Sequence, residues 1–244
     1  MVWNLEFEIW NLNPSPYSWL LLAGIAVSIF MWSRIARRDE RLLFIYVAAL
    51  IGAFLGAKVV YLFAEGWLDW PQSNRWQRLA TGKTILGGLL GGYAAVELAK
   101  KFTGYQSATG DWFALIAPLG ILLGRIGCGL HDCCLGAVCP RAWYTRDDAE
   151  GLARWPAVPV EFAFNALALI TFLLLRRKHL LPGQHFHLYL IAYGLFRFAH
   201  EFVRATPRVL GPLSGYALAA LATAAFGAGA FAWRARSQRD RATR

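Results

Sequence analysis

Residues 124–136, with the sequence GRIGCGLHDCCLG, hold the side chains of this chain that are best suited to chemistry. They include an arginine, a histidine and three of the four cysteines, directly after an apolar stretch from Leu115 to Leu123. An arginine at the end of an apolar helix is costly unless it meets an anion or a partner, so Arg125 is a candidate functional residue. We therefore expect other elements to complement its guanidinium.

A second charged cluster lies in the stretch YGLFRFAHEFVR. Arg197, Glu201 and Arg204 are spaced i, i+4 and i+7, which places them on one helical face with His200 beside them. One interpretation is an internal ion pair, in which Glu201 only neutralises Arg197. The other is a phosphate site, because two arginines with one carboxylate leave a positive charge and guanidinium groups bind phosphate in bidentate fashion.

Two further features of the apolar stretches have two interpretations each. Lys58, in GAKVVYLF, either snorkels toward the outer interface or lines a polar cavity. The motif GGLLGG supplies overlapping small-xxx-small pairs, which favour tight helix packing or leave room for a lipid headgroup or acyl chain. These glycines are Gly87, Gly88, Gly91 and Gly92.

The cysteines are separated by gaps of five, one and five positions, which match no common zinc spacing. They are Cys128, Cys133, Cys134 and Cys139. Three interpretations stay open. Structural disulfides would pair the adjacent Cys133 and Cys134 with the two outer cysteines; the others are plain buried thiols, and a metal or redox site with His131 and Asp132.

Composition indicates what kind of scaffold positions these groups. Hydrophobic residues make up 57% of the 244 residues, charged residues 16%, and the mean hydropathy is +0.38, which fits a polytopic membrane protein. The net charge of +10 is clustered between apolar stretches, so we expect a membrane and not a nucleic acid as the surrounding partner. Seven apolar stretches are long enough to span a bilayer: 16–33, 42–64, 83–99, 111–127, 157–175, 184–203 and 212–233.

The distribution of Lys and Arg predicts the orientation of this all-α, seven-span scaffold. One set of loops holds fourteen such residues and the other eight, which puts the amino terminus outside and the carboxy terminus in the cytoplasm. Residues 1–15 carry no charged leader, so we do not expect a cleaved signal peptide. We expect one transmembrane domain over 1–233 with an outer cap loop at 129–156, and a disordered basic cytoplasmic tail at 234–244.

Several of these stretches resemble signature segments of the bacterial prolipoprotein diacylglyceryl transferase family. They are GGLLGG, GRIG followed by Gly136, YGLFRF and HEFVR, in the family's order and at similar separations from about Tyr17 to Arg204. The resemblance implies a multi-pass enzyme of the bacterial inner membrane that moves the diacylglyceryl group of phosphatidylglycerol, or of another anionic phospholipid, to the lipobox cysteine thiol of a secreted preprotein. Glycerol phosphate leaves. We expect no cofactor, no metal and a monomer.

The resemblance also implies roles for individual residues. Arg125 and Arg197 would hold the phosphate and stabilise its charge in the transition state. The expected catalytic residues are Arg125, Arg197, Glu201, His131 and His200. The expected substrate-binding residues are Tyr17, Lys58, Gly87, Gly88, Gly91, Cys128, Gly136, Glu161 and Arg204.

The chain departs from the family's pattern where a proton acceptor is needed. Leu86 stands where the family has a histidine, Cys128 where it has an asparagine, and Cys133 where it has a glutamate. The segment VPVEF keeps Pro159 and Glu161 but lacks the family's histidine and glutamine.

The phosphate-binding half of the pattern is therefore kept, and the acid–base half is altered. His131 or His200 is a candidate replacement for the missing base. The alternative function is a non-catalytic or thiol- and metal-handling membrane protein that retains the lipid-binding scaffold.

Overall fold

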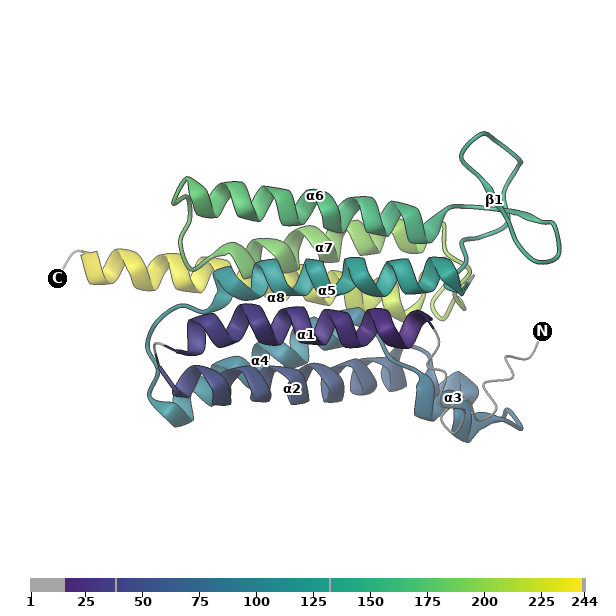
Figure 1. Ribbon diagram of the computed structural model, residues 1–244. Coiled ribbons are helices and arrows are strands. Elements are labelled where there is room, and N and C mark those ends of the chain that lie inside the picture. Colours follow the sequence, from purple (N-terminus) through teal and green to yellow (C-terminus); the bar gives the residue numbers. More distant parts are fainter. Residues whose placement is uncertain (1–15, 38, 132, 243–244) are drawn as a thin grey trace.

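Long apolar helices form most of the computed structural model, which describes residues 16–37, 39–131 and 133–242 (Figure 1). The expectation for residues 1–15 lies outside the described residues. The helices are α1 (Pro16–Ala36), α2 (Arg41–Ala64), the 3-10 helix η1 (Gly66–Asp69), α3 (Arg75–Thr81), α4 (Ile85–Thr103), α5 (Gly110–Leu130), α6 (Ala157–Arg177), α7 (His185–Glu201) and α8 (Gly215–Ala242). A short antiparallel hairpin pairs β1 (Arg146–Asp147) with β2 (Ala153–Arg154).

The chain is a helical membrane protein. Within the described residues, four helices are long and apolar enough to cross a bilayer, namely α2, α5, α6 and α8. A long helix also lies at each of the other three predicted stretches, as α1, α4 and α7. The predicted disorder of the tail is wrong as far as Ala242, because α8 continues to that residue. Its last turns are rich in alanine and arginine, which are good helix formers.

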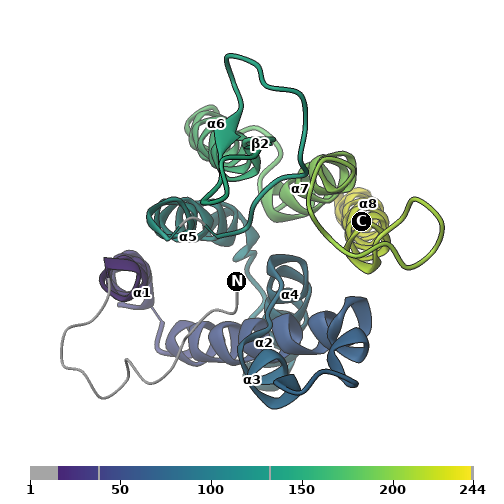
Figure 2. The same cartoon turned by 90° about the vertical axis from the view of Figure 1, so that its right-hand side faces the viewer.

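Helix α7 packs against α5, α6 and α8 (Figure 2). Seen from the end that carries the hairpin and α3, α1, α5, α7 and α8 form a bent row, with α6 on one side of it and α2 and α4 on the other. Tyr189, Leu190 and Tyr193 of α7 are fully buried in the largest apolar cluster. The same helix also buries His185, His187, Arg197, His200 and Glu201, which explains its weak hydropathy. A helix that buries polar residues inside a bundle is a place to look for a functional site.

Glycines bring α2 and α4 into direct backbone contact. A Cβ atom added to Gly56 would lie 2.3 Å from the carbonyl oxygen of Gly87, and one added to Gly91 would lie 2.3 Å from that of Gly52. Gly87 and Gly91 therefore serve helix packing, the first of the two interpretations of GGLLGG. Gly88 and Gly92 approach α2 less closely, since an added Cβ atom would lie no nearer than 3.6 Å and 3.5 Å, respectively, to any of its atoms.

We expect Gly56→Ala to destabilise the protein by about 1–3 kcal/mol, the usual cost of overpacking a tight contact. The new methyl group would have to push α2 and α4 apart. Thermal unfolding in detergent measures the effect. Gly229→Ala in α8 is the matched control, since no atom lies within 4 Å of its added Cβ and alanine is the better helix former. Equal melting temperatures for the two variants would contradict this packing role.

Candidate active site

Arg125 meets a buried carboxylate on the neighbouring helix. Near the end of α5, its Nη2 lies 2.8 Å from Oε1 of Glu161 on α6. Arg125 is 7% exposed and Glu161 is fully buried, so water screens this ion pair poorly. The apolar stretch that ends at Arg125 therefore delivers its guanidinium to a partner and not to solvent.

Glu161 is shared by three arginines. Its Oε2 lies 3.6 Å from Nη1 of Arg197 and 3.8 Å from Nη1 of Arg204, while its Oε1 accepts a hydrogen bond from Tyr193 at 2.8 Å. Such spacing places one carboxylate inside a ring of positive groups contributed by α5, α7 and the residues after α7.

A second carboxylate completes the charge balance of the cluster. Oε2 of Glu201 lies 2.9 Å from Nη2 of Arg197, as the i, i+4 spacing predicts. Oε1 of Glu201 accepts a hydrogen bond from Thr206. With Arg125 and Arg204 included, three arginines face two carboxylates, which leaves one positive charge in a buried setting.

Several donors in this cluster have no hydrogen-bond partner among the described residues. They are Nε of Arg125, Nη1 of Arg197, and Nε and Nη1 of Arg204. A buried donor without an acceptor costs about 1–3 kcal/mol, or more when it is charged. The oxygen atoms of a phosphate are acceptors that would satisfy such groups. The cluster is thus suited to an anion that the protein itself does not supply.

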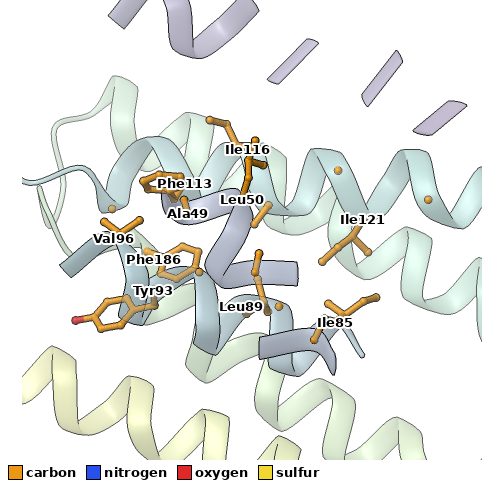
Figure 3. Close-up of a pocket in the computed structure, with 18 of the residues that line it drawn as sticks. Ala49, Leu50, Ile85, Leu89, Tyr93, Val96, Phe113, Ile116, Ile121 and Phe186 are labelled. Carbon is orange, nitrogen blue, oxygen red and sulfur yellow. The ribbon is translucent and has the colours of Figure 1, made fainter. Parts of the chain in front are cut away.

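Arg125 is one of the residues that line a mainly apolar cavity of about 550 Å³. Figure 3 shows the apolar part of this lining. Side chains from α2, α4, α5 and α7 line the cavity, among them Leu50, Leu89, Ile121 and Phe186. Along α5 the lining runs from Gly110 to Gly124, which corresponds to roughly 20 Å of helix at 1.5 Å per residue. That length exceeds half of the ~30 Å hydrocarbon core of a bilayer. The cavity can therefore hold an acyl chain whose polar end lies at Arg125.

The sequence profile of the prolipoprotein diacylglyceryl transferase family matches residues 5–233. The chain belongs to this family. Among its relatives, a phosphatidylglycerol–prolipoprotein diacylglyceryl transferase of Gloeobacter violaceus is 30% identical over 89% of this chain and 87% of its own length. Proteins of the same name from Clostridium tetani and Mannheimia succiniciproducens are 26% and 29% identical, over 83% of this chain and 85% and 81% of their own lengths.

The structure brings some of the predicted site residues of this transferase family member together and separates others. Gly88 lines the cavity, whereas Gly87 and Gly91 contact α2. The ammonium of Lys58 binds the carbonyl oxygens of Ala80 at 2.7 Å and Gly82 at 3.0 Å, at the end of α3. The side chain of Tyr17, on α1, is outside the described residues.

Gly136 holds the cap loop against the segment that follows α7. It forms an isolated β-bridge with Arg204, and a Cβ atom there would lie 2.2 Å from the carbonyl oxygen of Trp155. Trp155 in turn donates from Nε1 to Nε2 of His200 at 3.2 Å. The cap loop is thereby fixed directly over the arginine cluster. His131, the other candidate base, is half-buried and follows α5 directly.

Sequence reasoning missed two contributions. Glu161 was expected to bind substrate, but the structure makes it the shared partner of three arginines. Tyr193 was not expected to take part, and it donates to Glu161. A possible signal was its position: Tyr193 is four residues before Arg197 and so lies on the same helical face.

The four cysteines are free thiols in this structure, so the first of the three interpretations, structural disulfides, is not met. The Sγ atoms of Cys128, Cys133 and Cys134 lie within 4.8 Å of one another, while Cys139 is outside this group. Asp132, proposed above as a possible metal ligand, is outside the described residues. The thiols of Cys128 and Cys133, and then the positive charges of Arg125 and Arg204, lower the pKa of the Cys134 thiol well below its usual range.

We expect Glu161→Gln to lower the free energy of unfolding by about 3 kcal/mol, since loss of one partner of a buried ion pair leaves charge uncompensated. The variant keeps the shape of the side chain but leaves three arginines facing one carboxylate. Chemical or thermal unfolding in detergent tests this. The control is Asp147→Asn, which removes a 50% exposed partner of Arg141, itself 67% exposed, and should cost ~1 kcal/mol or less. Similar losses in both variants would argue against a central role for Glu161.

Proposed function

We propose that this protein transfers the diacylglyceryl group of phosphatidylglycerol to the lipobox cysteine thiol of a secreted preprotein. The observation that carries the proposal is the buried three-arginine cluster at the end of an acyl-sized apolar cavity. Membership in the transferase family and the names of its relatives support the same reaction.

The two parts of the site match the two parts of the lipid. The apolar cavity takes an acyl chain, and the surplus positive charge takes the phosphate diester of the headgroup. The guanidinium groups of Arg125 and Arg204 have N–H donors without a partner among the described residues. These donors can bind the phosphate oxygens where the headgroup meets the acyl chains. The site thus fixes the glyceryl carbon between an apolar tail and a held phosphate.

The reaction then requires little from the protein beyond charge and position. The acceptor sulfur attacks the glyceryl carbon, a C–S bond forms, the C–O bond to phosphate breaks, and the leaving phosphate keeps the electron pair. Arg125, Arg197 and Arg204 stabilise the charge that develops on it. Glu161 and Glu201 orient these guanidinium groups through the ion pairs described above. His131 and His200 remain candidates for accepting the thiol proton.

One observation favours the alternative function, a non-catalytic protein that handles thiols or metals. It is the three-thiol group of Cys128, Cys133 and Cys134 beside the arginines. The two functions differ in their dependence on Arg125. Loss of function in Arg125→Ala supports the transferase, whereas loss of function in Cys133→Ser with little effect of Arg125→Ala favours thiol or metal chemistry alone.

We further propose a seven-span, multi-pass monomer in the bacterial inner membrane, with the amino terminus outside and the carboxy terminus in the cytoplasm. Fourteen of the Lys and Arg residues outside the apolar stretches fall on the cytoplasmic side and eight on the other, in agreement with the positive-inside rule. The transmembrane domain covers 1–233 with the cap loop at 129–156, and the basic tail covers 234–244. The cap loop then faces the compartment of secreted preproteins.

Transfer is measured by mass spectrometry with purified protein in detergent, phosphatidylglycerol and a peptide that carries a lipobox cysteine. We expect a mass gain of one diacylglyceryl unit, reduced at least ~100-fold by Arg125→Ala, because one preorganised charge-stabilising group is commonly worth that much. Arg141→Ala is the control, since Arg141 is 67% exposed and pairs with Asp147 in the cap loop. No product beside an active control enzyme would reject the proposed reaction.

The orientation predicts opposite results for two reporter fusions. Green fluorescent protein fused after residue 244 should fluoresce, and alkaline phosphatase fused there should be inactive, because the carboxy terminus is cytoplasmic. The reporters inserted in the loop between α5 and α6 should give the reverse pattern. Alkaline phosphatase activity at the carboxy terminus would exclude this topology.

A further inference from the structure

The thiols of Cys128, Cys133 and Cys134 form a compact group at the mouth of the site. All three Sγ atoms lie within 4.8 Å of one another, and the Cys128 and Cys134 sulfurs are 3.9 Å apart. The group combines the last turn of α5 with the loop that follows it. None of these thiols is bonded to another cysteine.

Their spacing fits a shared metal ion. Thiolates bind zinc at about 2.3 Å, so two sulfurs on one ion lie about 3.8–4.0 Å apart in tetrahedral or trigonal geometry. The 3.9 Å separation of Cys128 and Cys134 falls in that range. A disulfide requires about 2.05 Å, so bonding any pair would need the thiols to move.

The backbone conformation of Cys134 and the position of Arg125 also support a metal site at these three thiols. Cys134 has a φ of 62°, a left-handed conformation that costs a residue with a side chain about 1–2 kcal/mol. Nη1 of Arg125 lies 3.7 Å from Sγ of Cys128 and stabilises a thiolate there. Positive neighbours of this kind offset the charge that three thiolates bring to one ion.

The position of the group relates it to both substrates. Cys128 and Cys134 line the apolar cavity, and all three cysteines line a small outer pocket of about 50 Å³. Trp155 and Arg146 of the cap loop line the same outer pocket. An ion held by the three sulfurs would therefore stand between the lipid cavity and the loop that faces the acceptor.

We propose that Cys128, Cys133 and Cys134 bind one zinc ion, whose fourth coordination position takes the acceptor cysteine thiol. Three protein ligands with one open position are the pattern of catalytic zinc sites. This inference rests on the proposed transferase function and supplies its thiol activation. Metal binding by the three cysteines can be tested without any transfer.

Coordination solves the problem of the thiol proton. A thiol bound to zinc is deprotonated outright, and its proton passes to water. The bound sulfur attacks the glyceryl carbon, the C–S bond forms, and the C–O bond to phosphate breaks with its electron pair on the phosphate. The product is a thioether, a weaker ligand than a thiolate, and leaves the ion. No oxidation occurs at any step.

Nearby histidines are less well placed for this role. Nε2 of His200 already accepts the indole proton of Trp155. The neutral ring then carries its own hydrogen on Nδ1, so neither ring nitrogen has a free lone pair for the thiol proton. Cys128 and Cys134 line the cavity together with Arg125, whereas neither His131 nor His200 is among its lining residues.

The first test uses Co²⁺ as a spectroscopic probe of the full chain, purified in detergent under reducing conditions. We expect about one ion per chain and near-ultraviolet sulfur-to-cobalt charge-transfer bands of the strength given by three thiolates. Zn²⁺ should displace the bands, and Cys134→Ser should lose at least a third of their intensity. Cys139→Ser is the matched control and should keep them, since Cys139 is outside the group.

A lipobox peptide should change the visible cobalt bands when its thiol enters the fourth position, while the same peptide with serine should not. Retained melting temperature in detergent shows that Cys134→Ser is folded. Absence of charge-transfer bands in the wild type, or equal bands in Cys134→Ser, overturns the metal site. No response to the cysteine peptide overturns the role of the fourth position.

Transfer activity separates the two proposals. Zinc removal and Cys134→Ser should each lower the transfer rate about tenfold or more, and added Zn²⁺ should restore only the stripped wild type. Full transfer in the metal-free wild type and in Cys134→Ser rejects the zinc inference and leaves the transferase function standing. A cobalt site without any transfer to the peptide rejects the transferase function, and with it the role of zinc in transfer.

Discussion

The buried carboxylate of Glu161 is the interaction on which the site depends. Three guanidinium groups from different parts of the chain cannot share a low-dielectric interior without a counter-charge, and Glu161 supplies it at 2.8 to 3.8 Å from each of them. Because Glu201 neutralises only one more charge, the cluster stays positive and its donors stay incompletely paired. Structural balance and affinity for an anion thus come from the same set of residues.

The apolar half of the site depends on backbone contact elsewhere. Gly56 and Gly87 let α2 and α4 pack without side chains between them, and Gly88 on a different face of α4 lines the cavity. One glycine-rich motif thereby serves packing on one face and open space on another. The sequence alone does not show which face of the helix each glycine of GGLLGG occupies, so helix packing and room for lipid stood as alternatives. In the structure different glycines serve the two purposes.

Local patterns predicted the helices and the pairs that lie on one helix. Hydropathy predicts the helices because a chain in a bilayer must form its backbone hydrogen bonds within each apolar segment. The i, i+4 spacing predicts the pairing of Arg197 with Glu201. The partner of Arg125 lies 36 residues away on another helix, which spacing cannot reveal. The cysteine gaps do not reveal the approach of Cys134 to Cys128 for a related reason, because it depends on how the loop after α5 folds back on the helix end.

The placement of the thiols relative to the charges suggests how the chemistry is divided. An acceptor sulfur must be anionic to attack carbon, yet the leaving phosphate must be stabilised by positive charge only a few ångströms away. Free thiolates there would compete with the phosphate for Arg125, whose guanidinium is already 3.7 Å from Cys128. In the zinc site proposed above, a divalent ion would offset half of the charge of the three cysteine thiolates and the acceptor thiolate, and it would hold these sulfurs at fixed positions beside the arginines. On this argument the cysteine group binds the attacking sulfur and the arginine cluster binds the leaving phosphate. The last turns of α5 connect the two groups, since they carry both Arg125 and Cys128.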